Sequence, residues 1–128
     1  MHFPRPKIIR ALVLMLGIAF AASACTPDEI ALFNRVTSGH QNVLSEAQLE
    51  RLRACESTGD YGVVSSNGKW FGAYQFTVQT WNGVAERNYP WLVGVKPNEA
   101  DWWWQDAMAK ALWAERGSQP WPVCGKRI

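Results

Sequence analysis

The sequence has few of the residues that build metal sites and catalytic triads. Two of its 128 residues are histidines, His2 and His40, and the three cysteines form no cluster with them at zinc-ligand spacing. The same shortage excludes Ser/His/Asp and Cys/His nucleophile arrangements. A glycine-rich phosphate loop is also absent from the sequence. We therefore expect neither a bound metal nor a cofactor.

A basic field for nucleic acid is lacking as well. The formal net charge is +2, but Arg5, Lys7 and Arg10 lie in the first 24 residues, and the rest of the chain has ten basic and eleven acidic side chains. Such a balance does not hold a polyphosphate backbone, so nucleic acid is excluded as a partner. Internal repeats and low-complexity tracts are absent too, and the length fits one small domain, which we expect to be a monomer.

The one long hydrophobic run lies at the N-terminus. Basic residues precede an apolar stretch from Ala11 to Ala22, and Ala22-Ser23-Ala24 has the small-x-small pattern of a cleavage site. Residues 1–24 are therefore predicted to be a signal peptide, and the alternative is a permanent N-terminal anchor. Cys25 follows directly, where a bacterial lipoprotein carries its lipid, so both lipidation and simple secretion stay open. Either way, we expect a secreted or cell-envelope protein.

Export would place the cysteines in an oxidising compartment, where an even number pairs. Cys55 and Cys124 both lie in the well-patterned part of the chain, so we predict a disulfide between them. Closing a loop of about 70 residues would stabilise the fold by about 4 kcal/mol on the chain-entropy model.

The helix signals divide the mature chain into two parts. Thr26 and Glu29 have capping-box spacing and predict a short helix to about Val36, followed by a linker, so that residues 25–43 precede the domain proper. The domain is predicted over residues 44–125. Its first helix runs from Glu46 to about Ser57, with Ser45 as the N-cap, Gln48 in the capping box and Gly59 as the stop.

Three further elements are predicted in the domain. Asn67-Gly68 between apolar runs indicates a β-hairpin. Thr77 is a candidate N-cap for a helix to about Glu86. Asn98 is predicted to open the last helix, which ends near Arg116. The fold class is therefore α+β and mainly helical, with a short β-hairpin and one disulfide.

Glu56 is the one carboxylate on the apolar stripe of the first domain helix. It follows Leu49 and Leu52 at i, i+3, i+7 spacing, so the three side chains share a face. Burial would raise its pKa, as a proton donor near neutral pH requires. The alternative is a buried acid paired with an arginine or a backbone donor.

The segment Arg53-Ala54-Cys55-Glu56-Ser57-Thr58-Gly59-Asp60-Tyr61 resembles the Cys-Glu-Ser-Gly-Gly-Asn-Tyr/Trp motif of actinobacterial resuscitation-promoting-factor and transglycosylase-like domains. The remaining family motifs follow in order, namely Asn67-Gly68, Gly72-Ala73-Tyr74-Gln75-Phe76, Thr80-Trp81, Gln105-Asp106 and Pro120-Trp121-Pro122-Val123-Cys124-Gly125. The resemblance spans about Leu44 to Gly125. Two positions depart from the family pattern, because Thr58 stands where glycine is usual and Asp60 where asparagine is common.

The resemblance implies a small lysozyme-like fold that cleaves the β-1,4 bond between N-acetylmuramic acid and N-acetylglucosamine in peptidoglycan glycan strands. It assigns Glu56 as the catalytic acid and pairs Cys55 with Cys124. The one nearby second carboxylate is Asp60, for which a turn role is the alternative. A single glutamate would then act as acid and base, either as a lytic transglycosylase or as a muramidase. A non-catalytic peptidoglycan-binding module of the same fold is the alternative function.

Candidate glycan contacts are spread along the domain: Tyr61, Tyr74, Gln75, Thr80 and Gln105. For Gln75 and Thr80 the alternatives are a backbone hydrogen bond and an ordinary helix position. The run Trp102-Trp103-Trp104 spans about 200° of helical arc, so at least one of its indoles must reach the surface. That indole is either a glycan platform or a lid over the N-terminal helix.

Overall fold

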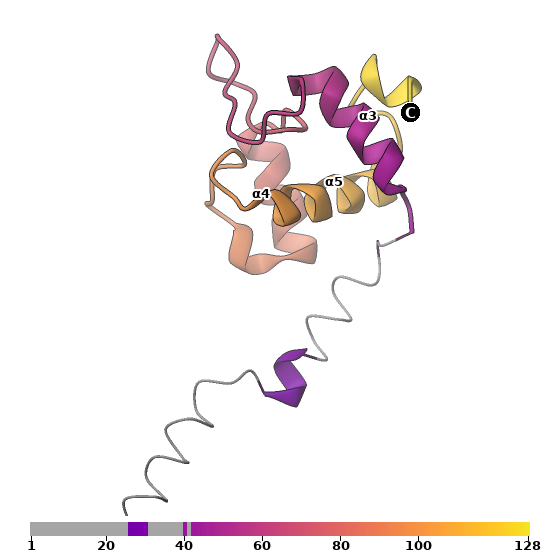
Figure 1. Ribbon diagram of the computed structural model, residues 1–128. Helices are drawn as coiled ribbons and strands as arrows, with labels where there is room; N and C mark the ends of the chain where they lie inside the picture. Colours follow the sequence, from indigo (N-terminus) through magenta and orange to yellow (C-terminus); the bar gives the residue numbers. More distant parts are fainter. Residues whose placement is uncertain (1–25, 31–39, 41) are drawn as a thin grey trace, which may run out of the picture. The chain divides into compact units, whose positions relative to one another are not determined.

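The structure is a computed structural model that describes residues 26–30, 40 and 42–128 (Figure 1). The predicted signal peptide, residues 1–24, and Cys25 lie outside the described residues. The chain divides into two units, Met1–Arg35 and Val36–Ile128. Within the described residues, no helix is long and apolar enough to cross a bilayer.

In the first unit, the described residues 26–30 hold the start of a helix. The predicted capping box is present: the Glu29 amide donates to Thr26 Oγ1 at 3.2 Å, and the Thr26 amide donates to Glu29 Oε2 at 2.7 Å. The remainder of the helix predicted to Val36 lies outside the described residues.

The second unit begins with helix α3, Glu46–Ser57, which has the predicted bounds. The predicted capping box is confirmed, since the Gln48 amide donates to Ser45 Oγ and the Ser45 amide donates to Gln48 Oε1 at 2.9 Å. Leu44, Leu49 and Leu52 are buried at the helix start and along one face. The apolar stripe thus turns the helix so that its last turn, with Glu56, lies at the edge of the core.

Helix α4, Val78–Asn88, begins after the predicted N-cap Thr77 and is followed by the 3-10 helix η1, Pro90–Leu92. Helix α5, Trp102–Arg116, ends before Gly117 as expected, but the prediction that it opens at Asn98 is wrong. Residues 96–100 form a separate turn in which the amides of Glu99 and Ala100 donate to the Lys96 carbonyl. The helix starts only after that turn is complete.

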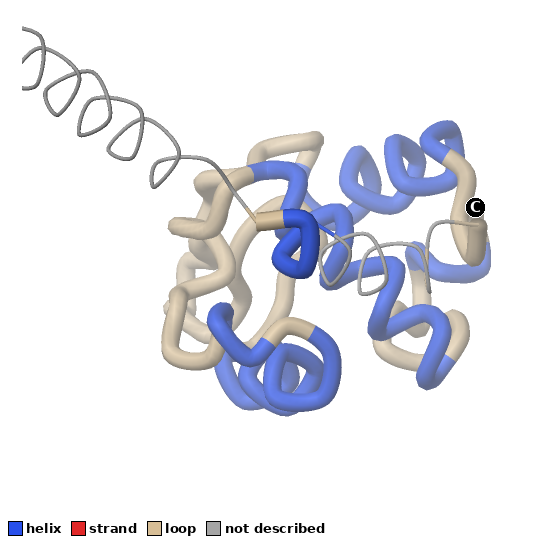
Figure 2. Tube along the Cα trace, turned by 90° about the horizontal axis from the view of Figure 1, so that it is seen from below, coloured by secondary structure: helices blue, strands red, loops and turns tan. Residues whose placement is uncertain are grey.

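The predicted hairpin is present in a minimal form. Its pairing is limited to isolated bridges, so Figure 2 shows no strand in the described chain. Two isolated antiparallel bridges join Val64 to Phe71 and Phe71 to Phe76. The amides and carbonyls of Phe71 and Phe76 exchange two hydrogen bonds of 2.9 Å, which close a four-residue loop over Gly72–Gln75. The ribbon therefore serves mainly to fold residues 62–76 back beside α3.

Helix α5 lies at the centre of the second unit, with α3, α4 and the C-terminal segment around it (Figure 1). Its residues Met108, Ala109 and Ala111 are fully buried, and small side chains allow the other elements to approach closely. The C-terminal 3-10 helix η2, Cys124–Lys126, packs on α3. The predicted disulfide between Cys55 and Cys124 is confirmed, and it bridges 69 residues of sequence.

The end of α3 holds a strained threonine. Thr58 has φ +58°, and its amide donates to the Ala54 carbonyl in an αL C-cap, while the Gly59 amide donates to the Arg53 carbonyl. The predicted stop at Gly59 is therefore one residue late, because Thr58 already takes the left-handed conformation. A β-branched residue is costly there, and glycine, the usual family residue, carries no such cost.

We expect Thr58→Gly to raise the free energy of unfolding by about 1 kcal/mol, because it removes the left-handed penalty of a Cβ-bearing residue. Urea denaturation of the oxidised protein measures the change. Thr58→Ala is the matched control, since it removes the exposed hydroxyl but keeps the Cβ. Equal stabilisation by both variants would show that backbone strain is not the cause.

Candidate active site

Glu56 lies on the last turn of α3 and lines a cavity of about 320 Å³. The other walls come from the hairpin loop and the C-terminal segment: Trp70, Gln75 and residues 120–124. The disulfide brings the C-terminal segment to this helix, since Cys124 lines the same cavity. The carboxylate thus faces a hollow built from segments far apart in the sequence.

Burial raises the pKa of the Glu56 carboxyl above its ordinary value of 4.5. No hydrogen bond or ion pair joins its side chain to another residue in the described part of the chain, where the two ion pairs are Arg53–Glu46 and Arg87–Glu115. Half-burial without a cationic partner favours the protonated form. The arrangement therefore suits a group that donates a proton into the cavity.

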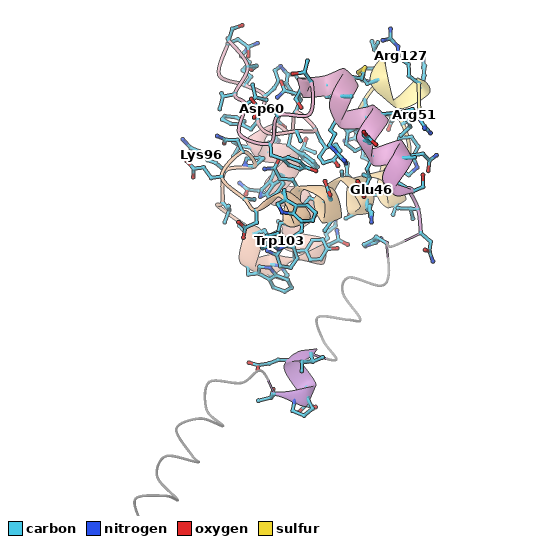
Figure 3. The ribbon with its side chains drawn as sticks, viewed as in Figure 1. Glu46, Arg51, Asp60, Lys96, Trp103 and Arg127 are labelled. Carbon is cyan, nitrogen blue, oxygen red and sulfur yellow. A yellow bond between two sulfur atoms is a disulfide. The ribbon has the colours of Figure 1, made fainter. Side chains whose placement is uncertain are left out.

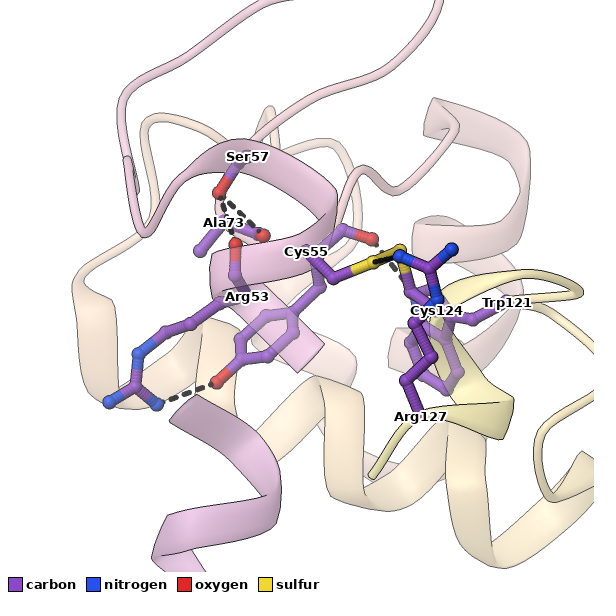
Figure 4. Close-up of a disulfide and its surroundings, with 8 residues drawn as sticks. Arg53, Cys55, Ser57, Ala73, Trp121, Cys124 and Arg127 are labelled. Atoms are coloured by element: carbon purple, nitrogen blue, oxygen red, sulfur yellow. Dashed lines mark hydrogen bonds between the residues drawn. A yellow bond between two sulfur atoms is a disulfide. The ribbon is translucent and has the colours of Figure 1, made fainter. Parts of the chain in front are cut away.

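The segment around Glu56 is held on both sides (Figure 4). Cys55 is bonded to Cys124, and the Ser57 hydroxyl lies 2.8 Å from the Ala73 carbonyl oxygen, to which it donates. The Trp121 indole N–H donates to the Tyr74 carbonyl at 2.9 Å, which fixes the far wall of the cavity to the hairpin segment. These bonds leave the carboxylate little freedom to shift relative to the groove.

A second cavity of about 340 Å³ adjoins the first and extends it toward α4 and α5. The two share Trp70, Gln75 and Pro120–Pro122, and the second adds Thr77, Thr80 and Arg116 among its walls. Together they form one groove, which we call the Glu56 groove. Four of the residues predicted from the sequence as catalytic or glycan-binding line this groove: Glu56, Gln75, Thr80 and the ring of Tyr74.

Gln75 stands between the two cavities in an unusual conformation. Its φ is +53°, and its side-chain amide donates to the Gly72 carbonyl at 3.0 Å. That hydrogen bond is the alternative that the sequence left open for Gln75, yet the residue also lines both cavities. Its amide oxygen has no hydrogen-bond partner within the described residues, so it is available to a ligand.

Tyr61 and Tyr74, also predicted as glycan contacts, instead meet inside the fold. Both hydroxyls donate to Asp106 Oδ1, at 2.8 and 2.5 Å, and Arg53 donates to the Tyr74 hydroxyl. Burial and the hydrogen bond to Asp106 raise the pKa of Tyr61 to about 12 and that of Tyr74 further still. The Tyr74 ring forms a groove wall, but its polar atom points into this interior network, and Tyr61 does not line the groove.

Gln105 is likewise buried and makes its hydrogen bonds inside the protein. It is 2% exposed, its Oε1 accepts from the Ala73 amide at 3.0 Å, and its Nε2 donates to the carbonyls of Tyr61 and Ala100. A Cβ at Gly72 would collide with the same Oε1 atom, so glycine is required there. With these bonds made inside the protein, Gln105 does not line the Glu56 groove.

Asp60 stabilises a turn, which is the alternative to a catalytic role that the sequence left open for it. Its Oδ1 accepts from the Gly62 amide at 2.9 Å, and the exposed side chain lines neither cavity of the groove. Sequence reasoning missed Trp70 and Trp121 as groove walls and Asp106 as the centre of the tyrosine network. Asp106 had one signal, namely an acidic residue next to the buried stripe of α5.

The tryptophan run opens α5, and none of its three residues lines either cavity of the groove; Trp103 is labelled in Figure 3. Trp102 and Trp103 are 58% and 47% exposed, as the helical arc requires, and their rings contact each other edge to face. Trp104 is half-buried and packs against Tyr89 and Trp91. The role of the exposed pair as a glycan platform remains a prediction.

Within the described residues there is no group of three or more His, Cys, Asp or Glu side chains that could hold a metal ion. His40 is part-buried, with Nε2 3.1 Å from Asn88 Oδ1.

Comparison with known proteins identifies the family. Residues 43–124 match the family described as transglycosylase-like domain. The chain is 30% identical over 79 residues to the resuscitation-promoting factor Rpf of Micrococcus luteus, covering 62% of this chain and 32% of the relative. It is 36% identical over 75 residues to the probable transglycosylase SceD 3 of Staphylococcus saprophyticus, covering 59% and 30%.

A longer alignment joins the chain to the resuscitation-promoting factor RpfA of Mycobacterium tuberculosis, with 26% identity over 116 residues that cover 91% of this chain and 26% of the relative. The chain thus spans about a third or less of the length of these relatives. The matched region contains the whole Glu56 groove, and with it both cysteines of the disulfide. This chain belongs to the transglycosylase-like domain family.

Proposed function

We propose that this protein is a peptidoglycan-cleaving glycosidase that cuts the β-1,4 bond between N-acetylmuramic acid and N-acetylglucosamine. The observation that carries the proposal is Glu56, a half-buried carboxyl of raised pKa that lines a groove bounded by tryptophans. Membership of the transglycosylase-like family and relatives named as transglycosylases support the reaction class.

In the proposed reaction, protonated Glu56 gives its proton to the bridging oxygen while the muramyl ring becomes oxocarbenium-like. The resulting carboxylate then accepts a proton from the attacking hydroxyl. No second carboxylate lines the groove in the described part of the chain, so one glutamate serves as acid and then as base. Attack by water makes a muramidase, and attack by the muramyl 6-hydroxyl makes a lytic transglycosylase.

The groove offers both kinds of contact that a glycan requires. Trp70 is 43% exposed beside Glu56, and an indole face can stack on a sugar ring. Gln75 and Thr80 present polar atoms to the same groove, where they can bind hydroxyl or acetamido groups. We assign these three residues as glycan contacts in place of Tyr61, Tyr74 and Gln105.

The proposed substrate requires an exported protein, and two features support export. The Cys55–Cys124 disulfide is typical of oxidising compartments. Residues 1–24 carry the pattern of a signal peptide, and Cys25 is placed for a lipid anchor.

We expect Glu56→Gln to abolish the release of soluble fragments from purified cell walls, because an amide has no proton to give to the leaving oxygen. In the unaltered protein, release should fall as the pH rises through the pKa of Glu56, which burial raises above the ordinary value of 4.5. Mass spectrometry of the products separates the two reactions, since an anhydro end marks transglycosylation and a reducing end marks hydrolysis.

The same substitution has a consequence for stability. The folded protein holds the Glu56 proton more tightly than the unfolded chain does, so stability should fall as the pH rises from 4.5 to the raised pKa. Glu56→Gln should remove this fall and match the unaltered protein at lower pH. Glu50→Gln, at an exposed position of the same helix, is the control.

Undiminished wall cleavage by folded Glu56→Gln would overturn the assignment of Glu56 as the catalytic acid. Wall binding without any cleavage by the unaltered protein would indicate a binding module.

We expect Gln75→Ala and Tyr61→Phe to separate a groove contact from an interior one. Gln75→Ala should raise KM or lower kcat by about tenfold, the effect of losing one or two hydrogen bonds to the substrate. Tyr61→Phe removes the bond to Asp106 and should lower the free energy of unfolding by about 1 kcal/mol, with little change in KM. Steady-state kinetics on soluble glycan strands and urea denaturation provide the two readouts. A large KM increase in Tyr61→Phe would show that Tyr61 contacts the substrate, against this assignment.

A further inference from the structure

A third hollow opens beside the Glu56 groove, next to the end of α5. It has a volume of about 750 Å³ and is lined by residues 115–119, Pro122 and Lys126. Three of its walls, Arg116, Gln119 and Pro122, also line the groove. The hollow is therefore a side branch of the groove, which we call the basic branch.

The charges of the basic branch are unbalanced. Arg116 and Lys126 are exposed and take part in neither ion pair of the described chain, which join Arg53 to Glu46 and Arg87 to Glu115. Each therefore presents a cation to the hollow without an internal counterion.

The one acidic residue in the wall does not cancel these cations. Glu115 accepts two hydrogen bonds from Arg87, at 3.1 and 2.8 Å, and another from Asn88. The hydrogen bond from Arg87 lowers the pKa of the Glu115 carboxyl and keeps it ionised, so its negative charge is paired with Arg87. The remaining charge that faces the branch is positive.

The other lining groups leave room for an extended ligand. Gly117 has no side chain, and Ser118 and Gln119 add a hydroxyl and an amide at the rim. A guanidinium, an ammonium and neutral donors around one hollow form a set suited to carboxylates, which guanidinium groups bind through two parallel hydrogen bonds.

We propose that the basic branch binds the free carboxylates of the stem peptide that hangs from the muramyl sugar. This inference rests on the proposed function, because it requires peptidoglycan in the groove. The peptide is attached through the lactyl group of the sugar whose bond is cut, so it must leave the groove sideways. Its glutamyl and terminal carboxylates then lie within reach of a cationic surface that is continuous with the groove.

Wall phosphate polymers carry anions that could bind the same cations. The stem peptide is favoured because it is tethered to the reacting sugar, which gives its carboxylates a high effective concentration beside the groove. A phosphate polymer that is not bonded to the reacting sugar has no such tether.

The test uses two soluble substrates that differ only in the peptide: glycan strands with stem peptides, and the same strands after amidase removes them. The readouts are kcat/KM for cleavage and Kd from tryptophan fluorescence. For the unaltered protein we expect a preference of about three- to tenfold for the peptide-bearing strands, the effect of two exposed charge contacts. The preference should decrease at high salt.

The double variant Arg116→Gln/Lys126→Gln should lose the preference, with a ratio near one. The control Lys96→Gln/Lys110→Gln makes the same change in net charge at positions outside the groove and the branch, and should keep it. A single Lys126→Gln variant, which does not touch the groove wall, should lose part of the preference.

The ratio of kcat/KM between the two substrates, and likewise the ratio of Kd, could be the same for the unaltered protein and the double variant. That result would overturn the proposal that the basic branch binds the stem peptide, and the glycosidase proposal would stand. A Kd preference without cleavage of either substrate would overturn the glycosidase proposal alone. Competition by soluble polyglycerol phosphate that abolishes binding to both kinds of strand equally would assign the branch to wall phosphates, against this proposal.

Discussion

The attachment of the last turn of α3 to the rest of the domain is the constraint on which the groove depends. Cys55 fixes it to the C-terminal segment and Ser57 fixes it to Ala73, so Glu56 lies between a covalent and a polar tether. The Trp121 indole holds residues 120–124 to the hairpin segment, and the disulfide holds them covalently to the helix, so its loss would loosen the wall that desolvates Glu56. A raised pKa requires that wall, because water would restore the charged form. The disulfide therefore supports the electrostatics of the site as well as the stability of the fold.

Behind the groove, the domain is held by buried polar groups as well as by an apolar core. Gln105 and Asp106 are neighbours on α5, and together they bind the backbone of Ala73 and the hydroxyls of Tyr61 and Tyr74. Such a network is directional, so it fixes the register of the hairpin segment against α5 more closely than apolar contacts alone would. Gln75 follows Tyr74 directly, and its place in the groove is set from behind by this network.

Local patterns in the sequence predicted the parts of the fold that depend on neighbours in the chain. The capping box at Ser45 predicted the start of α3, Gly59 predicted its end to within one residue, and the i, i+3, i+7 spacing put Glu56 on the face of the buried leucines. The start of α5 failed because Asn98 belongs to a separate turn around Lys96, and capping spacing alone does not show which turn continues into a helix. Tyr61 and Gln105 do not line the groove, and the sequence could not show this for another reason. Which partner a polar side chain meets depends on how α5 packs against the hairpin segment, and helical phase in one element does not contain that information.

The two left-handed residues that are not glycine illustrate how strain is distributed around the site. Thr58 and Gln75 both have φ above +50°, and both lie in turns closed by backbone hydrogen bonds. Thr58 is exposed and lines neither cavity of the groove, so its strain has no evident role in binding. Gln75 ends the loop between the paired residues Phe71 and Phe76, and the left-handed conformation is what brings its side chain between the two cavities. Strain that a fold retains at a binding site is tolerated because the surrounding bonds enforce it. By this criterion, only the strain at Gln75 belongs to the proposed binding site, and the strain at Thr58 is a local cost that glycine would remove.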